Sequence, residues 1–202
     1  SELVQNGNFS ELGSEAVTNG DFATDSDWSK SVTSPNIVQF QTGQVYLKRT
    51  VSAATEIFQS VFVVGKTYKV IIQANIISEG IAIEGNGNLS RTNLTSGANV
   101  FYLTPTSAVL RIICVNNTTE GYISNVSVKQ VDPNDRWITH TGWSIGVNGA
   151  TASNSSSYIK QNSVVTNGKT YKVVFDTIVT SGRFRAVTTA DASTYTPYVT
   201  QS

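Results

Sequence analysis

The chain has 202 residues, in which 14 Lys and Arg balance 14 Asp and Glu to a formal net charge of zero. This balance argues against a nucleic-acid footprint, which needs a basic surplus, and against a polybasic membrane-binding patch. Charged residues make up 14% of the chain and apolar residues 39%, and no apolar run reaches the roughly 18 residues of a membrane span. The single cysteine excludes a disulfide framework within the chain.

Helical periodicity is almost absent from the sequence, and short runs of β-branched and aromatic residues are separated by Gly, Asn, Ser and Thr. This pattern is typical of an all-β sandwich. The strands expected in the first two thirds of the chain are 36–41, 44–51, 56–63, 67–77, 80–84, 99–103, 108–115 and 121–130. The strands expected in the last third are 143–147, 157–164, 170–179, 183–188 and 195–200.

The sequence also contains an internal repeat. The hexapeptide GKTYKV occupies 65–70 and again 168–173, and in both places it follows an apolar run and opens a long expected strand. The pair Trp-Ser at Trp28 recurs at Trp143, so these two tryptophans are expected to fill equivalent core positions. Recurrence at this spacing predicts two homologous units.

The second unit lacks part of the first. The tripeptide YLT at 102–104 matches YVT at 198–200, but the strands 108–115 and 121–130 that follow in the first unit have no counterpart. A sandwich without two strands exposes an unpaired edge. We therefore expect the second unit to be completed by a longer natural chain or by a neighbouring subunit.

A turn-rich polar segment, VDPND, separates the two units, and an Asn-Gly-x-Phe motif is doubled near the start, at Asn6–Phe9 and Asn19–Phe22. The predicted organisation is a leader segment over 1–16, a first sandwich over 17–131, a linker over 132–136 and a second, incomplete sandwich over 137–202.

Alternation along the repeated strand identifies its core face, because successive side chains of a strand point to opposite sides. In the first unit we expect Tyr68, Val70 and Ile72 to be buried. The corresponding residues of the second unit are Tyr171, Val173 and Phe175.

Several of these motifs resemble a known family. The segment NGDF at 19–22 ahead of Trp28, the hexapeptide at 65–70 and the closing GYISNVSVK at 121–129 are similar to the jelly-roll carbohydrate-binding modules grouped as families four, nine and twenty-two. The likeness is greatest to the modules repeated in predicted bacteriophage virion proteins. It covers 17–131 and, in truncated form, 137–200. It implies tandem antiparallel jelly-roll sandwiches, the second one incomplete.

The resemblance implies a sugar site built from aromatic rings and hydrogen-bonding side chains. Gln73 and Asn75, on the face of their strand opposite Tyr68, and Arg111 are the candidates to bind sugar hydroxyls. Trp137 is a candidate for an inter-domain contact first and a sugar platform second. A purely structural role is the favoured alternative for the polar candidates, because polar residues on an outer sheet face are ordinary. The residues interpreted as half-buried sheet tyrosines are Tyr46, Tyr102, Tyr122, Tyr158 and Tyr195.

Related modules often carry a structural calcium ion, held by the Asn-Gly-x-Phe-Glu segment and an Asp of the last strand. Asp21 and Asn125 are the calcium candidates here. However, Ala23 replaces the Glu and Asn125 replaces the Asp, whereas calcium needs six to eight oxygen ligands. We therefore expect no cofactor.

The sequence gives no support for catalysis. It has no GxSxG nucleophile elbow, the one histidine, His140, has no partner at an informative spacing, and Cys114 lies inside an apolar run. We expect a protein that is not an enzyme.

Two functions stay open. The first is a non-catalytic structural or adhesion component of a bacteriophage virion (a fibre, tail or decoration protein), exposed on the particle. Its partners would be other virion subunits, host-surface glycans and further copies of itself, for example in a trimer, with no nucleic acid and no membrane insertion. The alternative is a carbohydrate-binding module of a secreted polysaccharide-degrading enzyme.

Overall fold

The computed structural model describes residues 2–84, 91–147, 149–188 and 199–200. The regular elements of these residues are all β-strands, so the all-β prediction is confirmed. The search of the same residues for an apolar helix of membrane-spanning length found none. Contacts within the chain define two units, one of Asn6–Lys160 and a smaller one of Ser1–Gln5 with Gln161–Ser202. Each unit is considered by itself.

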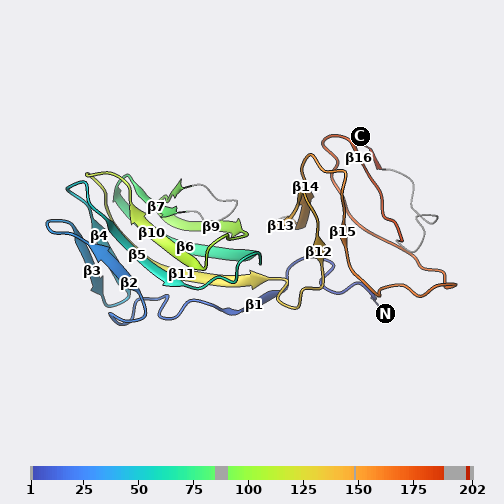
Figure 1. The fold of residues 1–202 in the computed structure, drawn as a ribbon, viewed down its shortest axis with the longest axis horizontal. Helices are drawn as coiled ribbons and strands as arrows, with labels where there is room; N and C mark the ends of the chain where they lie inside the picture. Colours follow the sequence, from blue (N-terminus) through green and yellow to red (C-terminus); the bar gives the residue numbers. More distant parts are fainter. Residues whose placement is uncertain (1, 85–90, 148, 189–198, 201–202) are drawn as a thin grey trace. The chain divides into compact units, whose positions relative to one another are not determined.

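The larger unit contains a sandwich of two antiparallel sheets (Figure 1). The first sheet consists, in spatial order, of β3 (Ile37–Gln41), β4 (Gln44–Lys48), β11 (Glu120–Val131), β6 (Tyr68–Ser78) and β9 (Gly97–Leu103), with β1 (Leu12–Glu15) also paired to β11. The second sheet consists of β2 (Ser29–Val32), β5 (Thr55–Ser60), β10 (Val109–Cys114), β7 (Ile81–Glu84) and β8 (Thr92–Asn93).

The strand order identifies the sandwich as a jelly roll. From β4 to β11 the chain crosses repeatedly between the sheets, and it places β4-β11-β6-β9 in one sheet and β5-β10-β7-β8 in the other. Eight strands in two such four-stranded sets form the double-sheet jelly-roll arrangement. The prediction of a jelly-roll sandwich is therefore confirmed, and β1 is an additional strand that precedes it in the chain.

The core lies between the two sheets and follows the predicted alternation. Tyr68, Val70 and Ile72 of β6 are 3%, 0% and 0% exposed, as expected. Ile57 of β5 and Ile112 of β10, from the opposing sheet, belong to the same buried cluster. Alternate residues of β6 therefore supply one half of the core, and the intervening residues face outward.

Residues 137–160 add short antiparallel pairs to the larger unit. The pairs are β12 (Ile138–Thr139) with β15 (Ile159–Lys160), and β13 (Trp143–Gly146) with β14 (Gly149–Ala152). In the smaller unit, β16 (Arg183–Phe184) pairs with β17 (Val199–Thr200). Residues 195–198 of the expected last strand lie outside the described residues.

The prediction of a strand over 170–179 is wrong. These residues form no strand, and Tyr171, Val173 and Phe175, which we expected in a core, are 36%, 56% and 36% exposed. The first copy of the hexapeptide becomes a strand because β6 is hydrogen-bonded to β11 on one side and to β9 on the other. In the part of the chain that the structure describes, the second copy has no such neighbours.

The turn at the start of the hexapeptide nevertheless has the same hydrogen bond in both copies. The hydroxyl oxygen of Tyr68 accepts a hydrogen bond from the Val63 backbone N–H at 2.9 Å, and that of Tyr171 accepts one from the Thr166 N–H at 3.0 Å. Gly65 has a φ of 83° at the turn that precedes Tyr68, a conformation that glycine adopts without steric cost. Local sequence is therefore sufficient for the turn, whereas the strand depends on its neighbours.

The predicted domain limits stay predictions. The two units defined by contacts have another boundary, after Lys160, whereas the linker was predicted at 132–136. The predicted leader 1–16 is also divided between the two units. Ser1–Gln5 belongs to the smaller unit, whereas β1 pairs with β11 of the sandwich in the larger unit.

Shortening a side chain should destabilise the protein in the first copy of the hexapeptide and have little effect in the second copy. Val70→Ala should lower the free energy of unfolding by about 1.5–3 kcal/mol, because Val70 is fully buried and its truncation leaves a cavity in a packed core. Val173→Ala, the matched change at an exposed position, should stay within about 0.5 kcal/mol. Urea denaturation followed by circular dichroism measures both, and equal losses would contradict the described difference in burial.

Candidate functional site

The outward face of the second sheet carries a cluster of charged side chains. Arg111 lies at its centre, on β10, paired across the strands with Phe58 of β5 and Glu84 of β7. Its neighbours Leu110 and Ile112 are buried in the core. Because side chains alternate along a strand, the Arg111 side chain is directed outward.

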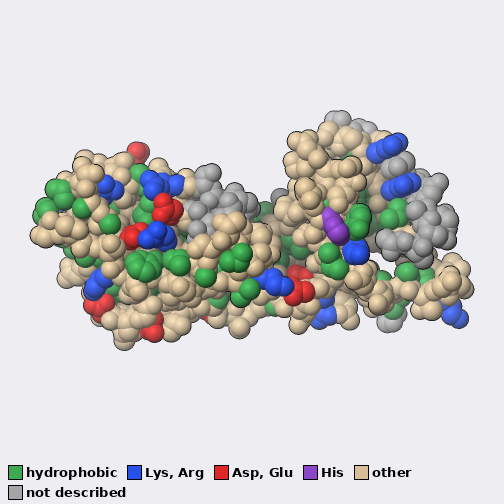
Figure 2. All heavy atoms as spheres, viewed as in Figure 1, with side chains coloured by type: hydrophobic (Ala, Val, Ile, Leu, Met, Phe, Trp, Pro, Cys, Tyr) green, Lys and Arg blue, Asp and Glu red, His purple; other side chains and the backbone are tan. Residues whose placement is uncertain are grey.

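Ion pairs hold this cluster together. A terminal guanidinium nitrogen of Arg111 lies 2.9 Å from a carboxylate oxygen of Glu56, and the other lies 3.8 Å from Glu84. Glu84 also pairs with Arg91 at 2.7 Å. The Arg111 guanidinium carbon lies 5.6 Å from the centre of the Phe58 ring, within the range of a cation–π contact. Figure 2 shows basic and acidic side chains gathered over this part of the larger unit.

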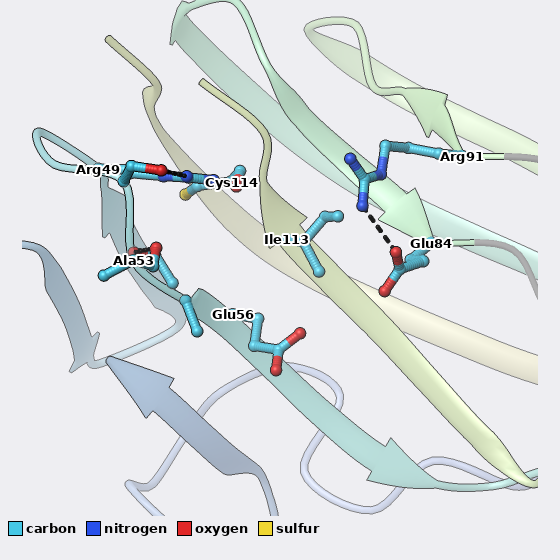
Figure 3. A pocket seen from close by; sticks show the side chains of 10 residues that line it. Arg49, Ala53, Glu56, Glu84, Arg91, Ile113 and Cys114 are labelled. Carbon is cyan, nitrogen blue, oxygen red and sulfur yellow. Dashed lines mark hydrogen bonds and ion pairs between the residues drawn. The ribbon is translucent and has the colours of Figure 1, made fainter. Parts of the chain in front are cut away.

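A hollow of about 330 Å³ lies beside these ion pairs. Figure 3 shows Glu84 and Arg91 directed toward each other at one side of it, Glu56 and Ile113 in the middle, and Arg49 with Cys114 at the other side. Arg49 is fixed there because one of its terminal nitrogens donates to the carbonyl oxygens of Cys114 and Val115, at 2.9 and 3.0 Å. We name this hollow the Arg111 pocket, because Arg111 forms ion pairs with two residues that line it, Glu56 and Glu84.

The Arg111 pocket offers binding groups held in fixed positions. Its guanidinium groups are hydrogen-bond donors and its carboxylates are acceptors, and both lie next to the apolar side chains of Ile113 and Phe58. Among the residues described, the Nε atom of Arg111 is buried and has no hydrogen-bond partner. A polar ligand with one apolar face could therefore use both kinds of group.

The nucleophile in the Arg111 pocket is not activated. Burial raises the pKa of the Cys114 thiol to about 12, although the nearby charge of Arg49 acts in the opposite direction. The thiolate is the reactive form of cysteine, so at neutral pH this group stays a protonated thiol. His140 packs elsewhere, with its ring 4.2 Å from that of Tyr158.

The structure does not bring the three predicted hydroxyl-binding residues together. Arg111 is on the second sheet, whereas Gln73 and Asn75 are exposed on β6 in the first sheet. Strand register places Asn75 directly opposite Tyr122 of β11, and Tyr122 opposite Tyr46 of β4. Sequence analysis interpreted these tyrosines only as half-buried sheet residues and did not detect that they are neighbours.

Tyr46 is held by a carboxylate. Its hydroxyl donates to Glu120 at 2.6 Å, and the second oxygen of Glu120 lies 3.0 Å from the amine of Lys48. Desolvation raises the pKa of Tyr46 to about 12, with the hydrogen bond to Glu120 and its negative charge as further causes. The same hydrogen bond and the one from Lys48 lower the pKa of Glu120.

Trp137, the fourth candidate, has a structural contact. Its indole N–H donates to the backbone carbonyl of Asn6 at 3.0 Å, and its ring lies 5.0 Å from that of Phe9. Trp28 contacts the second Asn-Gly-x-Phe motif in the same way. Its indole N–H donates to the backbone carbonyl of Asn19 at 3.0 Å, and the ring centres of Trp28 and Phe22 are 5.4 Å apart.

The expected equivalence of Trp28 and Trp143 is therefore corrected. Trp137 is the residue that makes the Trp28-like contact, through the Asn-Gly-x-Phe motif that we assigned to a leader. The doubled Asn-Gly-x-Phe motif was the sequence signal for this contact. The Trp-Ser pair at Trp143 instead led us to match Trp28 with Trp143 and not with Trp137.

The two calcium candidates lie near each other without a ligand cluster around them. Gly20, beside Asp21, accepts a backbone hydrogen bond at 2.8 Å from Val126, which follows Asn125. One carboxylate oxygen of Asp21 accepts from the Ala23 N–H at 3.3 Å. Among the residues that the structure describes, no group of three or more His, Cys, Asp or Glu side chains could hold a metal ion.

No family model and no curated protein matches this sequence. Among solved structures, the family 11 carbohydrate-binding module of the cellulosomal cellulase Lic26A-Cel5E of Clostridium thermocellum is similar, with a TM-score of 0.35 and 14% identity over 60% of this chain and 96% of that chain. A structure described as "CBM4 structure and function" has a TM-score of 0.34 and 19% identity over 63% of this chain and 99% of that one. The assignment to a jelly roll rests on the strand order.

The Trp137 contact predicts a measurable contribution to stability. Trp137→Phe keeps an aromatic ring but removes the indole donor, so the free energy of unfolding should fall by about 0.5–1.5 kcal/mol, the net value of one hydrogen bond. Trp28→Phe is the matched variant and should lose a similar amount. Urea denaturation of both variants checks this, and an unchanged stability in Trp137→Phe alone would show that the two contacts are not equivalent.

The raised pKa of Tyr46 predicts the pH at which its hydroxyl ionises and the pH range over which the associated stability is lost. Ultraviolet absorbance is followed against pH for the unmodified protein and for Tyr46→Phe, and the difference between the two curves reports the ionisation of Tyr46. This difference should have its midpoint near pH 12. Glu120→Gln should shift the midpoint toward the ordinary value without reaching it, because burial remains. Since the folded-state pKa is raised, the associated stability is fully present below pH 10 and is lost as the pH rises through about 12. A midpoint near 10 in the unmodified protein would contradict this contact.

Proposed function

We propose that this protein is a non-catalytic carbohydrate-binding module and that the Arg111 pocket is its sugar site. The observation that carries the proposal is the Arg111 guanidinium, which lies over the Phe58 ring and is paired with Glu56 and Glu84, two residues that line the hollow. A pocket with a few convergent polar groups beside apolar surface is the usual form of a small-ligand site. Sugars match it because they combine hydroxyl edges with an apolar ring face.

The carboxylates of the pocket are already ion-paired. Glu56 pairs with Arg111 at 2.9 Å, and Glu84 pairs with Arg91 at 2.7 Å. The paired carboxylates are suited to accept hydrogen bonds from sugar hydroxyls.

As the biological setting we propose a structural or adhesion component of a bacteriophage virion, exposed on the particle surface among other virion subunits. The motif resemblance at 19–28, 65–70 and 121–129 supports this setting, as do the low charge and the doubled motifs. Its ligands would be host-surface glycans, and further copies of the chain would complete the assembly, for example as a trimer. Detection of the chain by mass spectrometry in purified phage particles tests this setting.

The alternative setting is a module of a secreted polysaccharide-degrading enzyme, for which the same pocket would bind the enzyme's substrate. The two settings differ in the ligand: a panel of bacterial surface glycans tests the first, and plant and microbial storage or structural polysaccharides test the second. Binding to either panel supports the module function itself.

The pocket is tested by removing the guanidinium that pairs with both of its carboxylates. Arg111→Ala should weaken binding of the glycan selected from an array by about tenfold or more, because hydrogen bonds to a charged group contribute about 1.5–3 kcal/mol. Arg136→Ala is the matched control, since Arg136 is also ion-paired, to Glu11 at 3.0 Å, but Glu11 does not line the pocket. Calorimetric titration measures both variants, and equal affinities of Arg111→Ala and the unmodified protein would refute the assignment of the site.

A further inference from the structure

Four outward side chains form a continuous row across the first sheet, on the opposite side of the sandwich from the Arg111 pocket. Gln39 of β3 is paired with Tyr46 of β4, Tyr46 with Tyr122 of β11, and Tyr122 with Asn75 of β6. Adjacent strands lie about 4.8 Å apart, so the row extends roughly 14 Å across the sheet. We name these four residues the tyrosine row.

Aromatic rings form the centre of the tyrosine row, and amides form its ends. The ring centres of Tyr46 and Tyr122 are 5.0 Å apart, with an angle of 37° between the ring planes. Both rings are half-buried, while Gln39 and Asn75 are exposed. The hydrogen bond from Tyr46 to Glu120 fixes the first ring in place. The row is therefore an ordered aromatic surface with hydrogen-bonding groups on both sides.

The charge next to the tyrosine row is balanced. Glu120 and Lys48, which neighbour it on β11 and β4, form an ion pair with each other at 3.0 Å. The exposed side chains on the other side of Asn75 and Tyr122 are Gln73 and Asn125, which are neutral amides paired across β6 and β11. The surface thus offers donors and acceptors without a net charge that would select an ionic ligand.

This combination matches a neutral sugar polymer. Aromatic rings cover the apolar faces of sugar rings, and amides both donate to and accept from hydroxyl groups. A second copy of the chain is a poorer match, because the core of an interface between identical subunits is more apolar than the general surface, whereas exposed amides surround these rings. We propose that the tyrosine row is a second carbohydrate site, separate from the Arg111 pocket, which binds an extended neutral polysaccharide across strands β3, β4, β11 and β6.

The tyrosine pair also has a structural effect that the test must separate from binding. Cross-strand aromatic pairs stabilise a sheet by about 0.2–1 kcal/mol. Tyr102 provides the matched control, because it is a half-buried tyrosine on the outward face of the same sheet, opposite Lys69 and outside the row. Asn75→Ala provides a second variant that removes an amide of the row and leaves both rings in place.

The test is affinity electrophoresis of the full chain in native gels that contain, one at a time, soluble xylan, mannan, mixed-linkage β-glucan, dextran or the acidic polymer polygalacturonate. At least one neutral polymer should retard the unmodified protein more than polygalacturonate does. Tyr122→Ala should weaken that retardation about tenfold and Asn75→Ala about threefold, whereas Tyr102→Ala should leave it unchanged. Circular dichroism of each variant checks that it is folded, and if Tyr122→Ala is unfolded, the Asn75→Ala result decides.

Several outcomes would overturn the proposal. These are no retardation by any neutral polymer, stronger retardation by polygalacturonate, or equal retardation of Tyr122→Ala, Asn75→Ala and Tyr102→Ala. Gel filtration in which Tyr122→Ala converts an oligomer to a monomer would assign the surface to a second copy of the chain instead. Arg111→Ala, run in the same gels, separates the two sites: loss of retardation in that variant alone refutes the tyrosine row, whereas loss in Tyr122→Ala with unchanged retardation of Arg111→Ala supports it.

Discussion

The Asn6–Trp137 contact is the constraint on which the organisation of the larger unit depends. In the related Asn19–Trp28 contact, the donor and acceptor are nine residues apart in sequence, whereas the Trp137 indole reaches a carbonyl 131 residues away. The whole jelly roll is therefore inserted between the two halves of one local motif. Contacts at the ends of the insertion support this closure: the Asp132 N–H donates to the Glu11 carbonyl at 3.0 Å, and the Asn6 amide donates to the Asp132 carboxylate at 3.0 Å.

The strands that could be predicted from sequence are those whose burial alternates. β4, β5 and β6 bury alternate side chains over most of their length, and β10 does so over its first four residues. That period is visible without knowledge of the partner strand. β1, β2 and β8 lack it, because most of their residues are exposed or half-buried. They become strands by pairing with β11, β5 and β7. Residues 170–179 show the opposite case, since alternation without a paired neighbour did not make a strand.

The candidate sites were less accessible to sequence reasoning, because each depends on pairing between distant segments. Alternation correctly indicated that Gln73 and Asn75 face outward, but it does not state which of the two sheets a strand joins. That assignment follows from the jelly-roll order, which places β6 and β10 in different sheets. Similarly, Tyr46 and Tyr122 are 76 positions apart in the printed sequence, and only the register of β4 against β11 makes them neighbours.

The same alternation explains how one sandwich can carry two outward faces of different chemistry. Leu110 and Ile112 fill the core on either side of Arg111, and Val45 and Leu47 do so on either side of Tyr46. Core packing limits only the inward residues, because substitutions at outward positions usually change stability little. The outward positions can therefore hold ion pairs on one sheet and aromatic rings with amides on the other. Arg111 and Tyr46, one on each face, are thus each held between two buried neighbours on their own strand.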